Sequence, residues 1–164
     1  MSVVSTSTPN GFSIFCDDVR VEGNGKQIYI GVYLGEMLLT TPTASFPIRL
    51  PSLHVIVNYR ERKGDSDKPV RLCILIPGQD EPLVQTEIPR EHLDSIPLPT
   101  GSDIDDPMVL VSFIFAMRDV VLTQEGRIKV RAYLGDDEVR LGSLKVSLVP
   151  PPSTVAAPDA PPVN

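Results

Sequence analysis

The chain has no tryptophan and few of the residues that do most protein chemistry. Its 164 residues include only two cysteines and two histidines, and 5% are aromatic. Zinc catalysis typically needs three protein ligands, and neither a HExxH nor a CxxC spacing is present. The lack of tryptophan also removes the Cys–Trp–Cys core of antibody domains. These absences argue against a zinc enzyme and against a true antibody domain.

Long apolar runs are missing too. The longest nearly unbroken run, Met108 to Met117, is about half of the ~20 residues that a membrane helix needs. The first ten residues carry no lysine or arginine, so the basic leader of a secretion signal is absent. We therefore expect no membrane insertion and a cytoplasmic location. A net charge of -6 argues against nucleic acid as the main partner.

What the chain does have is apolar residues that alternate with a period of two. Successive side chains of a strand project to opposite faces, so this alternation predicts strands with one buried face. The predicted inward sets are Ile28-Ile30-Val32-Leu34, Leu53-Val55-Val57-Tyr59, Val70-Leu72-Ile74-Ile76 and Ile128-Val130-Ala132-Leu134. The run from Met108 to Met117 is apolar on both parities, as in a strand covered on both faces or one switching from core to interface.

This pattern predicts an all-β fold of about seven or eight strands, with no helix long enough for a βαβ crossover. We expect an antiparallel two-sheet sandwich, immunoglobulin-like or a similar Greek key. A closed β-barrel remains the alternative, because the pattern does not say whether the first and last strands pair. Residues 37–39 suit an edge strand, and residues 90–95 suit one helical turn.

The sequence divides into three parts. Residues 1–10 are rich in serine and threonine and read as a flexible lead. Residues 11–149 hold all the alternating segments and form the predicted β-sandwich domain. Residues 150–164 contain repeated prolines, which predict a disordered, extended tail.

Several short segments resemble a known family. They are Ile14-Phe15-Cys16-Asp17-Asp18-Val19-Arg20, Gly25-Lys26, Ile30-Gly31-Val32-Tyr33, Leu50-Pro51 and the Gly126-x-Ile-x-Val-x-Ala-Tyr run. Together they are similar to an uncharacterised, mainly proteobacterial family of unknown function. The resemblance spans roughly residues 12–149 and implies a bacterial origin and a single β domain. It implies no functional residue.

Asp17 and Asp18 interrupt an otherwise apolar strand. Phe12, Ile14 and Cys16 share one parity and Val19 resumes in the other, which predicts a bulge with one extra residue. Adjacent strand residues point to opposite faces, so the two carboxylates would not converge on a cation without a bend. We assign them a structural role at the bulge, in preference to a cation site or an acid/base pair.

Two acidic loops raise the alternative of a calcium-linked or carbohydrate-binding module. One loop holds Asp103, Asp105 and Asp106, and the other spans residues 136–138. Neither has the spacing of an EF-hand loop, and aspartate is common in turns for its side-chain hydrogen bonds. We therefore predict no metal site and no cofactor.

Catalysis has little support in the sequence. His54 lies in a predicted strand and His92 in a loop, and no GxSxG motif accompanies either. Cys16 and Cys73 each lie in a predicted strand, which favours small buried hydrophobic residues over reactive thiols. We predict no catalytic residue, and hence that the protein is not an enzyme.

A basic stripe is the clearest candidate for contact with a partner. The alternation places Arg127, Lys129, Arg131 and Tyr133 on one face of a strand. The next strand carries Lys145, which we expect on the same side. An acidic protein with a basic stripe can meet a partner rich in carboxylates or phosphates, although an ordinary solvated sheet face looks alike.

These observations predict a non-catalytic interaction or structural module. Such a module would act by self-association or by docking onto a larger assembly, through the 108–117 strand and the basic stripe. A large exposed apolar patch is rare on monomers, which favours the strand as the contact. A phage-derived structural protein is a further alternative, because such proteins assemble through sheet edges.

Overall fold

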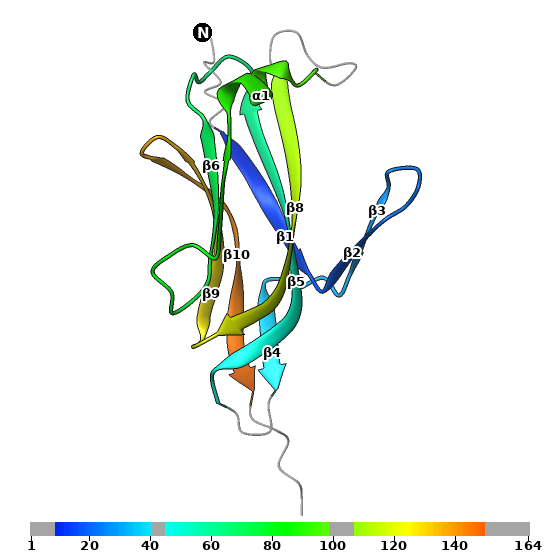
Figure 1. The fold of residues 1–164 in the computed structure, drawn as a ribbon, viewed down its shortest axis with the longest axis vertical. Coiled ribbons are helices and arrows are strands. Elements are labelled where there is room, and N and C mark those ends of the chain that lie inside the picture. The colour runs from blue at the N-terminus through cyan, green and yellow to red at the C-terminus, as the bar shows by residue number, and fades with distance from the viewer. Residues whose placement is uncertain (1–8, 41–44, 99–106, 150–164) are drawn as a thin grey trace, which may run out of the picture.

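A computed structural model describes residues 9–40, 45–98 and 107–149. In these residues the chain forms ten strands and one short helix (Figure 1). The helix, α1, spans Arg90–Ser95, the predicted helical turn. Within the same residues no helix has the length and apolar character to cross a membrane. The strands are β1 (Asn10–Cys16), β2 (Asp18–Val21), β3 (Gln27–Ile30), β4 (Glu36–Thr40), β5 (Ile48–Arg62), β6 (Val70–Leu75), β7 (Val84–Ile88), β8 (Met108–Leu122), β9 (Gly126–Leu134) and β10 (Asp137–Val149).

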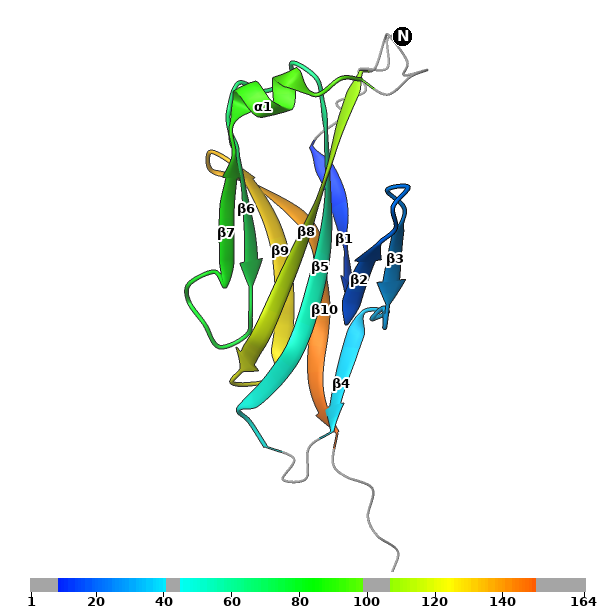
Figure 2. The ribbon, with the colours of Figure 1, turned by 45° about the vertical axis from the view of Figure 1, so that its right-hand side comes forward.

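Two sheets face one another across a shared core. The first has the order β1-β5-β8 and the second β4-β10-β9-β6-β7 (Figure 2). Side chains of both sheets form one buried cluster. The predicted inward sets of β5, β6 and β9 lie in that cluster, because alternate residues of these strands face the opposite layer. The period-two prediction is confirmed for these three strands.

The sheets are open, so the barrel alternative is wrong for the described residues. In the first sheet β1 and β8 are edges, and in the second β4 and β7 are edges. The pairing is also not wholly antiparallel. β4 runs parallel to β10, with Met37 beside Val146, and forms the edge strand expected around residues 37–39.

The inward set Ile28-Ile30-Val32-Leu34 is a wrong prediction. β3 ends at Ile30 and pairs only with β2, in a third sheet of two strands that stands apart from both layers (Figure 1). Ile28 is 44% exposed and Leu34 94% exposed. Alternation indicates that a strand has an apolar side, but this ribbon has no opposite layer for that side to enter.

A buried ion pair fastens α1 across one end of the two layers (Figure 2). The Glu61 carboxylate is almost fully buried, and its Oε1 accepts a bond of 2.5 Å from the Arg90 guanidinium. The Tyr59 hydroxyl donates to the other Glu61 oxygen at 2.7 Å. The Tyr59 pKa is raised above its ordinary value, mainly because the hydroxyl is buried and secondly because it donates to Glu61. Leu93 of α1 fills the space beneath the helix and is 1% exposed.

We predict that Arg90→Ala lowers the free energy of unfolding by about 3 kcal/mol, because it leaves the buried Glu61 carboxylate without its cation. Urea unfolding followed by circular dichroism measures this loss. Lys68→Ala is the control, since the ion pair between the Lys68 side chain and Asp137 is exposed and 4.0 Å long. That variant should stay within about 0.5 kcal/mol of the parent. Equal losses in the two variants would contradict the anchoring role.

Candidate functional site

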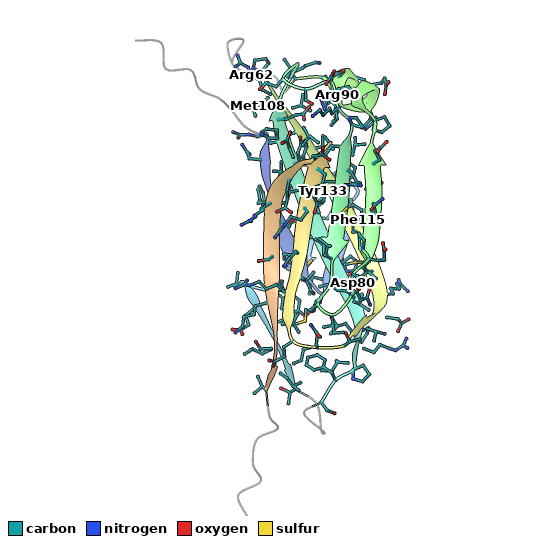
Figure 3. All side chains as sticks on the ribbon, turned by 90° about the vertical axis from the view of Figure 1, so that its left-hand side faces the viewer. Arg62, Asp80, Arg90, Met108, Phe115 and Tyr133 are labelled. Carbon is teal, nitrogen blue, oxygen red and sulfur yellow. The ribbon has the colours of Figure 1, made fainter. Side chains whose placement is uncertain are left out.

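The five predicted partner-binding residues lie together on the outer face of the five-stranded sheet. Arg127, Lys129, Arg131 and Tyr133 alternate along β9 on the side away from the core. The β9–β10 register places Lys145 directly across from Arg127. Figure 3 looks onto this face and labels Tyr133. We call these five residues the basic stripe.

Two cations of the basic stripe are already bound by acids. The Arg131 side chain is 13% exposed and lies 3.3 Å from the Glu138 carboxylate. The Lys145 ammonium lies 2.7 Å from Glu36 Oε1. The Glu36 pKa is lowered, mainly by the hydrogen bond from Lys145 and secondly by the one from Ser147. Much of the positive charge that the sequence suggested is therefore balanced within the sheet.

The structure adds Arg71 to this face. The β6–β9 register sets Arg71 beside Tyr133, and its guanidinium carbon lies 5.0 Å from the centre of the Tyr133 ring. On its other side Arg71 lies across from Glu87 of β7. Arg71 has the outward parity of β6, but its position beside Tyr133 depends on the order of strands in the sheet. The sequence pattern does not give that order.

Two other cations of the stripe make no acidic contact within the described residues. Arg127 donates to the Ser143 hydroxyl at 3.3 Å, and the exposed Lys129 extends outward from β9. The face therefore presents Lys129 as its most available charge, with Arg127 partly balanced by Glu36, whose pKa the Arg127 charge helps to lower, beside the stacked Arg71 and Tyr133. This combination suits a weak contact with an acidic surface.

The 108–117 run lies in β8, an edge strand of fifteen residues. β8 pairs with β5 over its length, and no described strand pairs with its other side. Val109 and Val111 face the core, whereas Leu110 is 53% and Ile114 37% exposed on the outer face. The odd-numbered residues of this run face the core and the even-numbered ones form an apolar outer face, which explains why both sets are apolar.

The inner face of β8 is incompletely covered as well. Phe113 and Phe115 stack with ring centroids 6.2 Å apart, and both stay partly exposed. Nearby, a groove of about 400 Å³ runs beside the end of β8, and Leu83, Val84 and Met117 contribute to its lining. The open side between β8 and β7 therefore carries apolar side chains both on β8 itself and in the neighbouring groove.

Asp17 and Asp18 lie where the chain changes partner, not in a bulge of one strand. β1 pairs with β5 up to Cys16, and β2 pairs with β3 from Asp18 onward. The Tyr33 hydroxyl donates to the Asp17 carboxylate at 2.5 Å. Burial, followed by this bond, raises the Tyr33 pKa. The Asp18 carboxylate instead makes an exposed pair of 3.5 Å with Arg20 of the same strand, so only the Asp17 carboxylate ties the junction to a distant residue.

Next to this junction, Ser52 and His54 lie close enough to suggest a nucleophile and a base. Ser52 Oγ is 3.3 Å from His54 Nδ1. However, the Ser52 hydroxyl donates to the Asp17 carbonyl at 2.9 Å, and Nδ1 lies 2.9 Å from the same oxygen. A general base has to accept the proton of its nucleophile. Here both groups are directed at a backbone carbonyl, a structural arrangement.

The remaining titratable residues show no convergence. Cys16 and Cys73 are buried free thiols whose pKa values are raised by burial. His92 lies exposed in α1. In the described part of the chain, no three histidine, cysteine or acidic side chains are grouped to hold a metal. The acidic loop around Asp103 and Asp105 lies outside the described residues, and Glu138 is paired with Arg131 and Arg140.

The comparisons with known proteins agree with the family resemblance seen in the sequence. The chain belongs to the Family of unknown function (DUF6941), whose profile matches residues 11–147. No curated protein matches the chain significantly, and no solved structure does so either. The predicted membership of an uncharacterised family is confirmed. The family has no assigned function, so the inference about function has to come from the surfaces described above.

We predict that Gly31→Ala destabilises the protein more than Gly25→Ala, because only Gly31 packs against the Asp17 junction. Both glycines have positive φ angles, +67° and +82°. A Cβ at Gly31 would overlap the Asp17 carboxylate, whereas one at Gly25 would have nothing within 4 Å. We expect losses of about 3 and about 1 kcal/mol in urea unfolding. Indistinguishable midpoints would show that the junction does not hold the β2–β3 ribbon.

Proposed function

We propose that this protein is a non-catalytic interaction module that docks by adding a partner strand to the open edge of β8. The observation that carries the proposal is a fifteen-residue edge strand with apolar side chains on both faces. A strand at a sheet edge presents unpaired N–H and C=O groups, which are a template for another strand.

The pairing of β8 with β5 defines which backbone groups face the open edge. Lys63 N–H donates to the Pro107 carbonyl at 2.8 Å, one step beyond the Arg62–Met108 pair. Bonded and non-bonded pairs alternate in an antiparallel ladder, so the odd-numbered residues of β8 bond to β5. The even-numbered residues, Ser112 among them, direct N–H and C=O outward.

The β8 edge lacks the features that normally protect an edge strand. Protected edges are short or carry lysine, proline or a bulge. Residues 108–117 contain no charge and no proline, and their register with β5 is unbroken. The edges of the facing sheet, β7 and β4, have five residues each and carry Glu87 and Glu36. β1, the second edge of the sheet that holds β8, has seven uncharged residues and lies against β10. This contrast supports β8 as the strand that is covered in use.

The arrangement of Ser52 and His54 supports a role without catalysis, because neither is free to activate the other. The basic stripe is a second, separate surface on the opposite layer, suited to a weak contact with an acidic region. A phage-derived structural component would use the same open edge.

We also infer that the two layers form an immunoglobulin-like sandwich. With β1, β5 and β8 taken as strands A, B and E, the first sheet has the order A-B-E. The second then reads G-F-C-C′ through β10, β9, β6 and β7, which is the order of that fold. β4 extends this sheet beyond G. The shared core between the layers supports the same interpretation.

The docking edge can be tested with a strand peptide and two variants at Ser112. The probe is a fluorescent peptide of residues 108–117 with two lysines at each end for solubility. Ser112→Pro removes an outward N–H and places a ring on the open edge, without breaking a bond to β5. Ser112→Thr keeps the N–H and is the matched control.

We expect the peptide to bind the parent and Ser112→Thr alike, and Ser112→Pro about tenfold more weakly. Fluorescence anisotropy of the labelled peptide, with protein titrated from below to well above micromolar concentration, measures the affinities, and circular dichroism checks that all three proteins are folded. A parent that binds no peptide, or a proline variant that binds it as tightly as the parent, would overturn the proposal.

A further inference from the structure

We infer that the strand accepted by β8 is β8 of a second copy, paired antiparallel about a twofold axis through Phe113. This inference rests on the proposed docking edge and names its partner. It follows from the size, charge and exposure of the residues that the symmetric pairing would bring together.

Symmetry limits how two β8 strands can pair. Outward-directed groups must face one another, so even-numbered residues must lie opposite even-numbered residues. The uncharged window of residues 108–117 keeps its longest pairing when the axis passes through 112 or 113. An axis through 114 would set Leu110 against Arg118 inside the apolar row, whereas an axis through 113 meets Arg118 only at the end of the pairing, opposite Met108.

Side-chain size selects the axis at Phe113. That axis places Leu110 opposite Ala116 and Ser112 opposite Ile114 on the outer face, so each large side chain meets a small one. An axis through Ser112 would instead oppose Leu110 with Ile114 and leave two serines facing each other. Leu110 and Ile114 are the exposed apolar residues of β8, so the pairing covers the side chains that most need covering.

The inner face gains cover as well. With the axis at Phe113, the Phe113 rings of the two copies meet, and Phe115 lies opposite Val111 of the other copy. Both phenylalanines are only partly buried in one copy. β7, the edge of the facing sheet on this side, has only five residues (Figure 2). The aromatic pair that one copy leaves half covered would become the centre of the contact.

The contact area is adequate for a reversible dimer. Nine paired residues at about 3.4 Å each give a contact about 30 Å long. With side chains on both faces it would bury on the order of 600 Å² on each copy, near the lower limit of specific interfaces. About eight new backbone hydrogen bonds would join the edges. We therefore expect a dimer that dissociates in the micromolar range.

Single cysteine substitutions can read the register directly. Phe113→Cys places two cysteines across a non-hydrogen-bonded pair, where Cα atoms are about 4.5 Å apart and a disulfide fits. Leu110→Cys is the matched control, because its symmetry mate would lie about 20 Å away. The native Cys16 and Cys73 are buried at 0% and 3% exposure, and the parent should stay uncross-linked.

The double variant Leu110→Cys with Ala116→Cys covers the case in which Phe113→Cys does not fold. Both positions are exposed, and each cysteine would lie opposite the other across the axis at about 5.5 Å. After mild oxidation, non-reducing gels should show covalent dimer for Phe113→Cys and for the double variant. Leu110→Cys alone and Ala116→Cys alone should each show no covalent dimer on the same gels.

Light scattering across a micromolar range should show a reversible dimer of the parent and a monomer of Ser112→Pro. Cross-linking of Ser112→Cys or of Leu110→Cys alone, in place of Phe113→Cys, would overturn the register. A strictly monomeric parent that still binds the strand peptide would overturn the second copy as partner, and would leave the docking edge standing. Loss of peptide binding in the parent would instead count against the docking edge itself.

Discussion

The hydrogen-bonding needs of the backbone shape this molecule more than any side chain does. Every buried N–H and C=O has to find a partner. β5 meets that need on both sides, through β1 and β8, and therefore forms the buried centre of its sheet. β8 is paired on one side only, over fifteen residues with apolar side chains on both faces, and in the described residues its other edge is open to solvent. The fully paired strand and the strand with an open edge are thus neighbours in one sheet.

The rest of the structure keeps that edge in place. The facing five-stranded sheet supplies the other half of the core, and α1 covers one end of the layers through the Glu61–Arg90 pair. Edges that are short or charged, such as β4 and β7, have natural protection against added strands. On the outer face of the second layer, internal pairs with Glu36 and Glu138 reduce the charge of the basic stripe. The charge that it presents to solvent is accordingly smaller than the sequence suggested.

How far the sequence could predict this structure depends on whether each feature is local. The alternation in β5, β6 and β9 follows from strand geometry alone, and it correctly identified their buried faces. The same alternation misplaced Ile28 and Leu34, because only the three-dimensional arrangement shows that the β2–β3 ribbon has no opposite layer.

The sequence also showed that Asp17 interrupts a strand, but a change of partner strand and a bulge produce the same interruption in the sequence pattern. Arg71 beside Tyr133 was missed, since strand order within a sheet is a long-range property. In residues 108–117 both odd- and even-numbered positions are apolar, which indicated a strand with two apolar faces. The structure shows in addition that one edge of this strand is unpaired within the described part of the chain.

The central claim is that the outward-facing amides of β8 are bonded only when another strand is added. Hydrogen exchange followed by nuclear magnetic resonance, residue by residue along β8 and over a range of concentrations, tests it most directly. We expect the amides of Val111, Phe113 and Phe115 to be protected at every concentration, because they bond to β5. Those of Leu110, Ser112 and Ile114 should exchange quickly in dilute solution and slowly in concentrated solution. Slow exchange of these three amides even in dilute solution would contradict the claim, and fast exchange at all concentrations would contradict the second copy as the added strand.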